Sequence, residues 1–163
     1  MTIPRVLSLA VGTTLILTAA TAGAQGPPQY GPPITLDQAK RVMSGAEAEA
    51  KKNNWAVVIT ILDSGGNLVM SQRLDGAQFG SIDVARDKAF SAVAFRRPTK
   101  VFSDAVAQGG GNLRLLNVTG ASLLDGGLPI VIDGKIAGGI GVSGVTGEQD
   151  AQIGKAGVDA LKP

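Results

Sequence analysis

Residues 126–144 read GGLPIVIDGKIAGGIGVSG, and this segment predicts the architecture of the whole chain. Two apolar runs, residues 128–133 and 135–143, meet at Asp133-Gly134, a dipeptide typical of a tight turn between antiparallel strands. The glycines of the second run match the G-x-G-x-x-G pattern of dinucleotide-binding turns, which requires a preceding strand and a helix that begins within the glycines. Here the glycines lie inside the strand itself. They therefore predict close approach of another backbone, a helix or a flat ligand.

A second hairpin is predicted nearer to the N-terminus. Residues 55–62 are apolar and rich in β-branched side chains. In residues 67–74 apolar and polar side chains alternate less regularly, and the sequence DSGGN between the two runs is typical of a turn. Outside the hairpins, apolar residues recur at helical spacing, and Thr35 forms a capping-box pair with Gln38 at the start of the first helix. Residues 112–127 show neither helical nor strand periodicity. The predicted helices cover residues 35–54, 81–96, 99–108 and 147–161. This order predicts an α+β domain in which helices pack on an antiparallel sheet.

The composition excludes several kinds of chemistry. The chain has 163 residues, enough for one domain, and contains no Cys and no His. Without Cys it has no disulfide, thiolate nucleophile or iron–sulfur cluster, and without His it has no imidazole base and no His-ligated metal. The formal net charge of +2 is too small for a nucleic-acid-binding surface, so we expect no nucleic-acid partner.

The N-terminal segment has the features of a secretory signal peptide. Arg5 precedes an apolar run, residues 6–20, and the small-residue sequence Ala-Gly-Ala ends at Ala24. The alternative is a membrane anchor, but a spanning helix needs about 20 apolar residues, and this run is shorter and is interrupted by Gly12. We therefore expect residues 1–24 to be cleaved, which leaves a periplasmic or secreted protein without a membrane span.

The rest of the chain divides into a linker and a domain. Residues 25–33 read QGPPQYGPP, a composition that predicts an extended tether. Residues 34–163 contain all the predicted helices and strands and form one domain. Because this domain lacks Cys, we expect its stability to rest on packing and on contacts between subunits rather than on disulfides.

The helix predicted at residues 81–96 and its surroundings carry the candidate binding residues. The basic residues here include Arg86 and Arg97, and all four phenylalanines lie between Phe79 and Phe102. Because arginine forks match carboxylates and aromatic rings suit flat molecules, the region is a candidate pocket for a planar anionic small molecule. A solvated helix face with phenylalanines in the core is the alternative.

Two long motifs resemble the GlcG/HbpS family. One is GSIDVARDKAFSAVAFRRPT at residues 80–99, and the other is the hairpin at residues 126–144, followed by GEQD at residues 147–150 and by Ala156-Gly157. The sequence DSGGNL at residues 63–68 also fits the first hairpin of the family. Together these motifs extend the resemblance over essentially the whole predicted domain.

The resemblance implies a profilin-like, three-layer α/β/α fold with a central antiparallel sheet of about five strands. It also implies a homo-oligomer, because family members tend to oligomerise. Exported members are described as haem-binding, a related domain is fused to corrinoid enzymes, and the family is sometimes labelled haem-degrading. Other members are encoded in glycolate-utilisation operons.

The chain departs from the family at the iron motif. Exported haem-binding relatives carry Glu-x-x-Glu on the first helix, whereas this chain has Glu47-x-Glu49, so no metal site is carried over. Because His and Cys are absent, an axial ligand to haem iron would have to be a hydroxyl, Tyr30, or a thioether such as that of Met70. We therefore expect haem, as a ligand, to bind weakly and exchangeably.

The sequence favours an exported protein that binds haem or a related planar, anionic tetrapyrrole over an enzyme. One alternative is an enzyme that acts on a small hydroxy- or keto-acid or degrades haem, with Asp83 and Lys88 as acid–base residues. Another is an accessory subunit that presents the helix at residues 81–96 to a partner. The expected ligand contacts are aromatic, hydroxyl-bearing and charged side chains, namely Arg73, Phe79, Ser81, Asp83, Arg86, Phe90, Arg97, Thr99 and Lys100.

Overall fold

The two predicted hairpins pair with each other in one antiparallel sheet. In the computed structural model, which describes residues 26–162, the strand order is β2-β1-β4-β3. The central pair, β1 and β4, is in register with Ile61 opposite Ile140. The strands are β1 (Val58–Asp63), β2 (Leu68–Arg73), β3 (Gly127–Ile132) and β4 (Lys135–Ser143).

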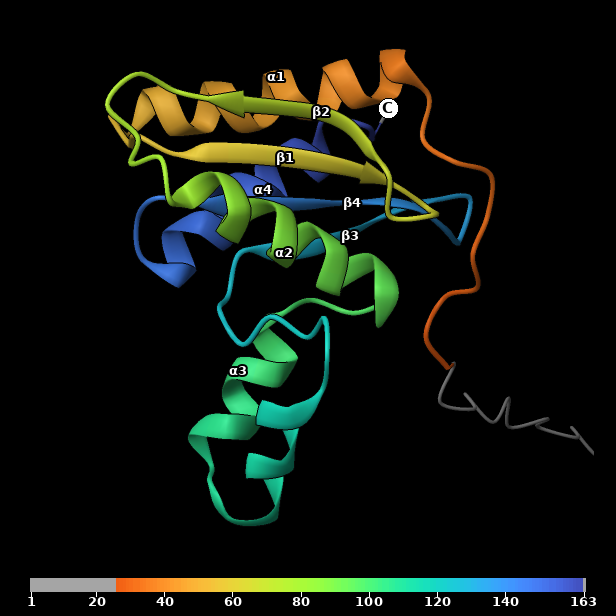
Figure 1. The fold of residues 1–163 in the computed structure, drawn as a ribbon. Helices are drawn as coiled ribbons and strands as arrows, with labels where there is room; N and C mark the ends of the chain where they lie inside the picture. Colours follow the sequence, from red (N-terminus) through yellow and green to blue (C-terminus); the bar gives the residue numbers. More distant parts are fainter. Residues whose placement is uncertain (1–25, 163) are drawn as a thin grey trace, which may run out of the picture.

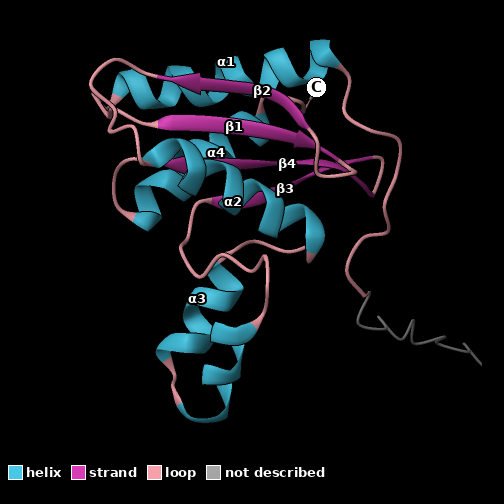
Figure 2. Ribbon diagram, viewed as in Figure 1, coloured by secondary structure: helices cyan, strands magenta, loops and turns pink. Residues whose placement is uncertain are grey.

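The sheet lies between two layers of helices (Figures 1 and 2). Helices α1 (Leu36–Lys52) and α4 (Gly147–Asp159) pack against each other on one face, and α2 (Ser81–Ala94) covers the other face. This arrangement confirms the predicted three-layer α+β fold. The expectation of about five strands was wrong by one, because the residues beside the start of β4 make only an isolated bridge, between Tyr30 and Ile136.

The stretch without a clear sequence pattern, residues 112–127, begins in a projecting arm and ends at the start of β3. Helix α3 (Lys100–Ala107) and the 3-10 helix η1 (Gly110–Asn117) extend away from the sheet (Figure 1). None of the residues of η1 is buried. Since η1 encloses no core of its own, no periodic apolar pattern marks it in the sequence, whereas α3, which buries Phe102, falls within the helix predicted at residues 99–108.

Capping boxes fix the starts of the two helices that share a face. The Thr35 hydroxyl accepts from the backbone N–H of Gln38, whose side chain accepts in return from the Thr35 N–H, as the sequence predicts. Thr146 and Gln149 form the same pair at α4. Each cap satisfies N–H groups that the helix itself leaves without a partner.

The main core lies between the sheet and helices α1 and α4. It is almost entirely aliphatic, and its members from the strands lie on one face of the sheet. Burial of these side chains supplies most of the driving force for folding. The core consists of Ile34, Ala39, Val42, Met43, Ala46, Ala50, Val57, Ile59, Ile61, Ile130, Ala137, Ile140, Val142 and Ile153.

The opposite face of the sheet approaches α2 through glycines. A Cβ built on Gly141 would lie 1.9 Å from the carbonyl oxygen of Ala85, and one on Gly139 would lie 2.6 Å from Cγ2 of Val93. No side chain fits at such distances, so α2 packs with its backbone against β4. The prediction that the strand glycines permit close approach of a helix is confirmed.

The segment expected to be a tether is extended and also bound to the domain. The Tyr30 hydroxyl donates to the carbonyl oxygens of Val93 and Ala94, each at 3.0 Å, and the Gly31 N–H donates to the carbonyl oxygen of Ile136 at 2.9 Å. The predicted signal peptide, residues 1–24, lies outside the described residues. Among residues 26–162, no helix combines the length and the apolar character needed to cross a membrane.

Candidate functional site

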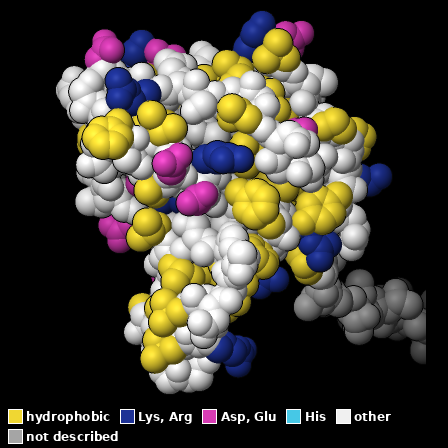
Figure 3. All heavy atoms as spheres, in the orientation of Figure 1, with side chains coloured by type: hydrophobic (Ala, Val, Ile, Leu, Met, Phe, Trp, Pro, Cys, Tyr) yellow, Lys and Arg dark blue, Asp and Glu magenta, His cyan; other side chains and the backbone are white. Residues whose placement is uncertain are grey.

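Three side chains of α2 and one from the turn just before it form a surface that we call the α2 stripe: Phe79, Ile82, Arg86 and Phe90. The spacing of four residues places Ile82, Arg86 and Phe90 on one helix face. Phe79 is 80% exposed, and Ile82 and Phe90 are each 43% exposed, which is unusual for large apolar side chains. Figure 3 shows hydrophobic side chains beside cationic and acidic ones on this face of the molecule.

A cavity adjoins the stripe at Phe90. It has a volume of about 320 Å³ and is lined by Val84, Asp87, Phe90, Gly120, Ala121, Ser122 and Leu124. Gly120 adopts a positive φ of 81°, and a Cβ there would lie 2.9 Å from Cε1 of Phe90. The opposite edge of the ring faces Gly66, where a Cβ would lie 3.3 Å from Cδ2 and Cε2, so the ring is held between two glycines while remaining 43% exposed.

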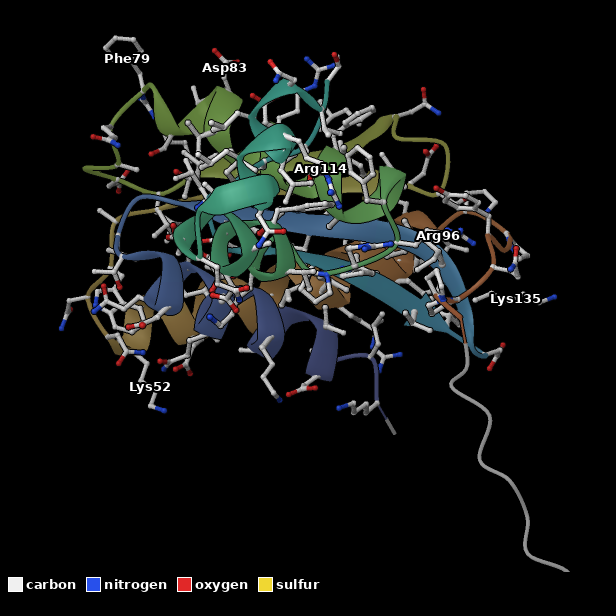
Figure 4. The ribbon with its side chains drawn as sticks, turned by 90° about the horizontal axis from the view of Figure 1, so that it is seen from below. Lys52, Phe79, Asp83, Arg96, Arg114 and Lys135 are labelled. Atoms are coloured by element: carbon white, nitrogen blue, oxygen red, sulfur yellow. The ribbon has the colours of Figure 1, made fainter. Side chains whose placement is uncertain are left out.

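Acidic residues flank the stripe. Asp83 and Asp87 are exposed on α2, on either side of Arg86 in the sequence. Figure 4 shows Phe79 and Asp83 projecting outward near the start of α2, on the opposite side of the sheet from Lys52 of α1. The predicted contacts Phe79, Asp83, Arg86 and Phe90 thus lie on α2 and on the turn just before it.

The two predicted hydroxyl contacts are used inside the fold. Ser81 is fully buried, and its hydroxyl oxygen lies 3.1 Å from the Gln78 amide nitrogen and 3.2 Å from the Ser143 hydroxyl. Thr99 is also fully buried and accepts from the backbone N–H of Gly127 at 3.0 Å. Ser81 is the first residue of α2 and Thr99 lies beyond its last turn, and their hydroxyls hold neighbouring segments together.

The predicted basic contacts after α2 have partners of their own. Arg97 donates through Nε to the carbonyl oxygen of Phe95 at 3.0 Å, and its guanidinium lies 5.8 Å from the ring centre of Phe102. Lys100 pairs with Asp104 at 2.7 Å, and this hydrogen bond raises the pKa of Lys100. Both side chains are exposed, but neither is part of the α2 stripe.

Arg73 lies in a different hollow. A cavity of about 440 Å³ opens between the end of α1 and the end of β2. Its lining is mostly polar and includes both acidic and basic side chains, so this cavity is unlike an apolar ligand-binding surface. The cavity is lined by Glu47, Lys51, Asn54, Trp55, Ala56, Gln72, Arg73, Leu74 and Asp75.

Neither of the two side chains considered as axial ligands lies on the stripe. The Tyr30 hydroxyl is bonded to the backbone at the end of α2, and the Arg96 guanidinium lies 5.5 Å from its ring centre. Met70 is half-buried against the main core. The stripe therefore presents aromatic, aliphatic and charged groups without a strong ligand for haem iron.

The glutamates of α1 are bound to neighbouring side chains. Hydrogen bonds from Gln152 and Asn53 lower the pKa of Glu49, and the hydrogen bond from Lys51 lowers that of Glu47. Within the part of the chain that the structure describes, no group of three or more His, Cys, Asp or Glu side chains is placed to hold a metal ion.

The most buried charges belong to a pair that sequence reasoning did not identify. Lys88 donates to Asp150 and to the carbonyl oxygen of Val142, both at 2.8 Å, and the two charged side chains are 3% and 2% exposed. The sequence interpretation had joined Lys88 with Asp83, which instead faces solvent. One signal was present: Lys88 falls on the apolar face of its helix, beside Ala85 and Ala89.

Burial and charge act in opposite directions on Asp150. Burial raises the pKa of its carboxyl group, and the charge of Asp125 acts in the same direction, whereas Lys88 and the backbone N–H of Val145 oppose the rise. Because a buried ion pair loses its hydration, such a pair is expensive unless its remaining hydrogen bonds are made. This pair is therefore a candidate for a functional role.

Known proteins resemble the chain over most of its length. A family model described as HbpS-like, haem degrading protein HbpS-like, matches residues 34–159. An uncharacterized 15.0 kDa protein from the dhaT-dhaS intergenic region of Citrobacter freundii is 38% identical over 130 residues, which cover 78% of this chain and 92% of that protein. Protein GlcG of Escherichia coli is 38% identical over 112 residues, covering 68% of this chain and 81% of GlcG.

Solved structures share the fold. Protein ORFY of Klebsiella pneumoniae superposes with a TM-score of 0.75 at 31% identity, over 85% of this chain and 97% of ORFY. HbpS gives 0.74 at 31% identity, over 90% and 100% of the two chains. A PduOC–haem complex gives 0.72 at 27% identity, over 80% and 96%. The sequence and structural matches together show that the chain belongs to the HbpS-like family, which includes GlcG.

Proposed function

We propose that the protein binds haem, or a related planar tetrapyrrole, on the α2 stripe. The observation that carries this proposal is the row of exposed apolar side chains interrupted by a single arginine. The relatives support it, because the family model describes haem-degrading proteins and one related structure is a haem complex. Neither the Lys100 nor the Arg97 side chain is needed for this mode of binding.

The stripe suits the chemistry of the ligand. Ile82 and Phe90 lie eight residues apart, which corresponds to about 12 Å along a helix, so a macrocycle can lie flat over both side chains. Arg86 lies between them and can pair with a propionate through a charge-assisted hydrogen bond. Asp83 and Asp87 would repel a second propionate near the helix, which favours a single orientation.

We expect the binding to be weak and exchangeable. The stripe offers stacking and one arginine pair, whereas Tyr30 and Met70 are engaged elsewhere in the fold. Affinity then depends on apolar contact and on one charged hydrogen bond rather than on an iron–protein bond. A carrier that receives and releases haem has this behaviour.

Export and oligomerisation complete the proposal. The predicted signal peptide would deliver the protein to the periplasm or the exterior, where it could meet free haem. A second copy that faces the first across the ligand would cover the exposed side of the macrocycle. Size-exclusion chromatography with light scattering, with and without haem, measures whether copies associate and whether haem promotes it.

A haem titration followed by the Soret band tests the site. We expect a saturable shift with wild-type protein and binding weaker by about 1.5–3 kcal/mol in Arg86→Ala, the value of a hydrogen bond to a charged group. Arg41→Ala on α1 is the matched control and should bind like wild type. Absence of a saturable shift at micromolar haem, or equal affinity in the two variants, contradicts the proposal. Bleaching of the band with a reductant would instead indicate haem degradation.

A further inference from the structure

The buried ion pair lies at a small pocket that the proposed haem site does not use. We call it the Lys88 pocket; it lies where α2 passes the end of β4 and the start of α4. Its volume is about 180 Å³, equivalent to about six water molecules in the liquid. It is therefore too small for a tetrapyrrole. The lining residues are Gln78, Val84, Lys88, Leu124, Asp125, Ser143, Gly144, Val145, Gly147 and Asp150.

The base of the pocket presents an ammonium group with one donor to spare. A lysine has three N–H groups, and Lys88 uses two of them on Asp150 and Val142. No acceptor among the described residues takes the third. A donor in this position, at a side chain that is 3% exposed, gains a partner if a ligand supplies an oxygen.

The backbone of Gly126 packs directly against the ion pair. A Cβ on Gly126 would lie 3.0 Å from the Lys88 nitrogen and 2.7 Å from Cβ of Asp150. Gly126 also has a φ of 115°, which side-chain-bearing residues rarely adopt. Any other residue there would press on the ion pair.

Gln78 and Ser143 add neutral polar groups to a lining that also contains Val84, Leu124 and Val145. The side chains of Gln78, Ser81 and Ser143 form a hydrogen-bonded chain, with separations of 3.1 and 3.2 Å. Gln78 is exposed and lies at the mouth. Hydroxyl and amide groups both donate and accept, so they can bind either an alcohol or a carbonyl group.

The charge of the pocket selects against anions. Lys88 contributes one positive charge, whereas Asp125 and Asp150 contribute two negative charges, so the lining is negative overall. Asp125 is held at the pocket because its carboxylate accepts from the Gly126 N–H at 2.7 Å. A carboxylate ligand would be attracted by the lysine but repelled by both aspartates, whereas an uncharged ligand avoids the repulsion.

We propose that the Lys88 pocket binds a small, uncharged hydroxy-carbonyl compound. Its carbonyl oxygen accepts from the free N–H of Lys88, and its hydroxyl group joins the chain formed by Ser143, Ser81 and Gln78. This site is distinct from the α2 stripe, although Val84 and Leu124 also line the cavity beside Phe90. The proposal does not depend on haem binding and is tested without haem.

Saturation-transfer NMR with lactamide and lactate tests the charge selection. The two probes have nearly the same shape, and only lactate carries a negative charge. We expect saturable binding of lactamide and at least tenfold weaker binding of lactate. Equal binding of the two probes, tighter binding of lactate, or no saturable binding of lactamide would overturn the proposal.

A charge variant makes the test sharper. Asp125→Asn keeps an oxygen that can accept from the Gly126 N–H and removes one negative charge. It should therefore reduce the difference in affinity between lactamide and lactate. Asp133→Asn is the matched control, because Asp133 lies in the distant β3–β4 turn, where a φ of 50° suits asparagine. The control should retain the wild-type difference. An identical effect of the two variants counts against the proposed site.

Two further variants separate loss of binding from loss of the fold. The double variant Lys88→Met/Asp150→Asn removes both charges at similar volume, and its thermal melt reports folding directly. If folded, it should lose lactamide binding.

Gln78→Leu changes only the exposed mouth and should weaken lactamide binding at least threefold, whereas Gln108→Leu at the end of α3 should not. Unchanged binding in Gln78→Leu, or binding retained by the folded double variant, contradicts the proposal.

Discussion

The two faces of the sheet are packed in different ways. On the face that α1 and α4 cover, large aliphatic side chains such as Ile140 and Ile153 fill the space between the layers. On the other face, Gly139 and Gly141 bring the α2 backbone directly against β4. Polar groups of α2, including Lys88 midway along the helix, add buried hydrogen bonds on this face, whereas the main core on the first face is almost entirely aliphatic.

Because of this difference, one face of the sheet mainly stabilises the fold, and the other carries the proposed binding surface. The aliphatic face directs its large β-branched side chains into the main core. Close backbone packing on the other face leaves the outer side of α2 uncovered, with Phe79, Ile82 and Phe90 exposed. The α1/α4 layer thus packs the main core, while the α2 layer carries the groups with which a ligand can interact.

Removal of one partner of the buried pair should have the largest effect. Lys88→Met leaves the Asp150 carboxyl group buried without its cation, which should lower the free energy of unfolding by about 3–5 kcal/mol. The double variant Lys88→Met/Asp150→Asn should recover most of that loss. Urea unfolding followed by circular dichroism measures both. Equal loss in the single and double variants would show that the pair has no special energetic coupling.

The close contact between α2 and β4 should rank second. Gly141→Ala places a Cβ 1.9 Å from the Ala85 carbonyl oxygen, so the layers must separate, at a cost of about 3 kcal/mol. Gly111→Ala is the control, since nothing lies within 4 Å of the added Cβ. Thermal unfolding of the two variants compares them. A tolerated Gly141→Ala would mean that backbone contact does not define this face.

A conservative change on the aliphatic face should cost less. Ile140→Val removes one methylene from the main core and should lower the free energy of unfolding by about 0.5–1.5 kcal/mol. Haem and lactamide binding should remain unchanged, because the altered side chain points toward α4. A change in either affinity would show that the two faces are coupled. Unfolding in urea and the two binding titrations provide the measurements.

The smallest effect concerns acid stability between α1 and α4. Hydrogen bonds from Gln152 and Asn53 lower the pKa of Glu49 below its ordinary value of 4.5. A lowered pKa in the folded state means that this contribution is present above about pH 4.5 and is lost as the pH falls further. Glu49→Gln should therefore show a slightly smaller loss of stability between pH 7 and pH 3 than wild type. Gln152→Leu should shift the acid dependence in the same direction; an unchanged dependence in both variants would be the contrary result.

Local patterns in the sequence were sufficient to predict most of the fold. Asp133-Gly134 and the DSGGN turn mark the two hairpins, and Thr35 marks the start of α1, because each depends on residues close in sequence. The strand glycines also predicted close packing of a helix. The arm at residues 100–117 was only partly predicted, because η1 encloses no core and lacks a periodic pattern.

The candidate site was less predictable, because it depends on contacts between distant residues. Lys88 and Asp150 are separated by 62 positions, and nothing local indicates that they pair. Ser81 and Thr99 were predicted as ligand contacts, but the fold uses their hydroxyl groups internally. Asp83, Arg86 and Phe90 lie together on α2, since helical spacing alone determines that they share one helix surface, and Phe79 lies in the turn just before it.

The central claim is that α2, rather than the α1/α4 face, binds haem. Paramagnetic ferric haem broadens nearby amide signals, so a ¹H–¹⁵N spectrum recorded during titration locates the bound ligand directly. We predict broadening of the amides of Ile82, Arg86 and Phe90, with Ala46 of α1 and Ile153 of α4 unaffected. Broadening centred on α1 or α4, or on the cavity beside Arg73, would contradict the account.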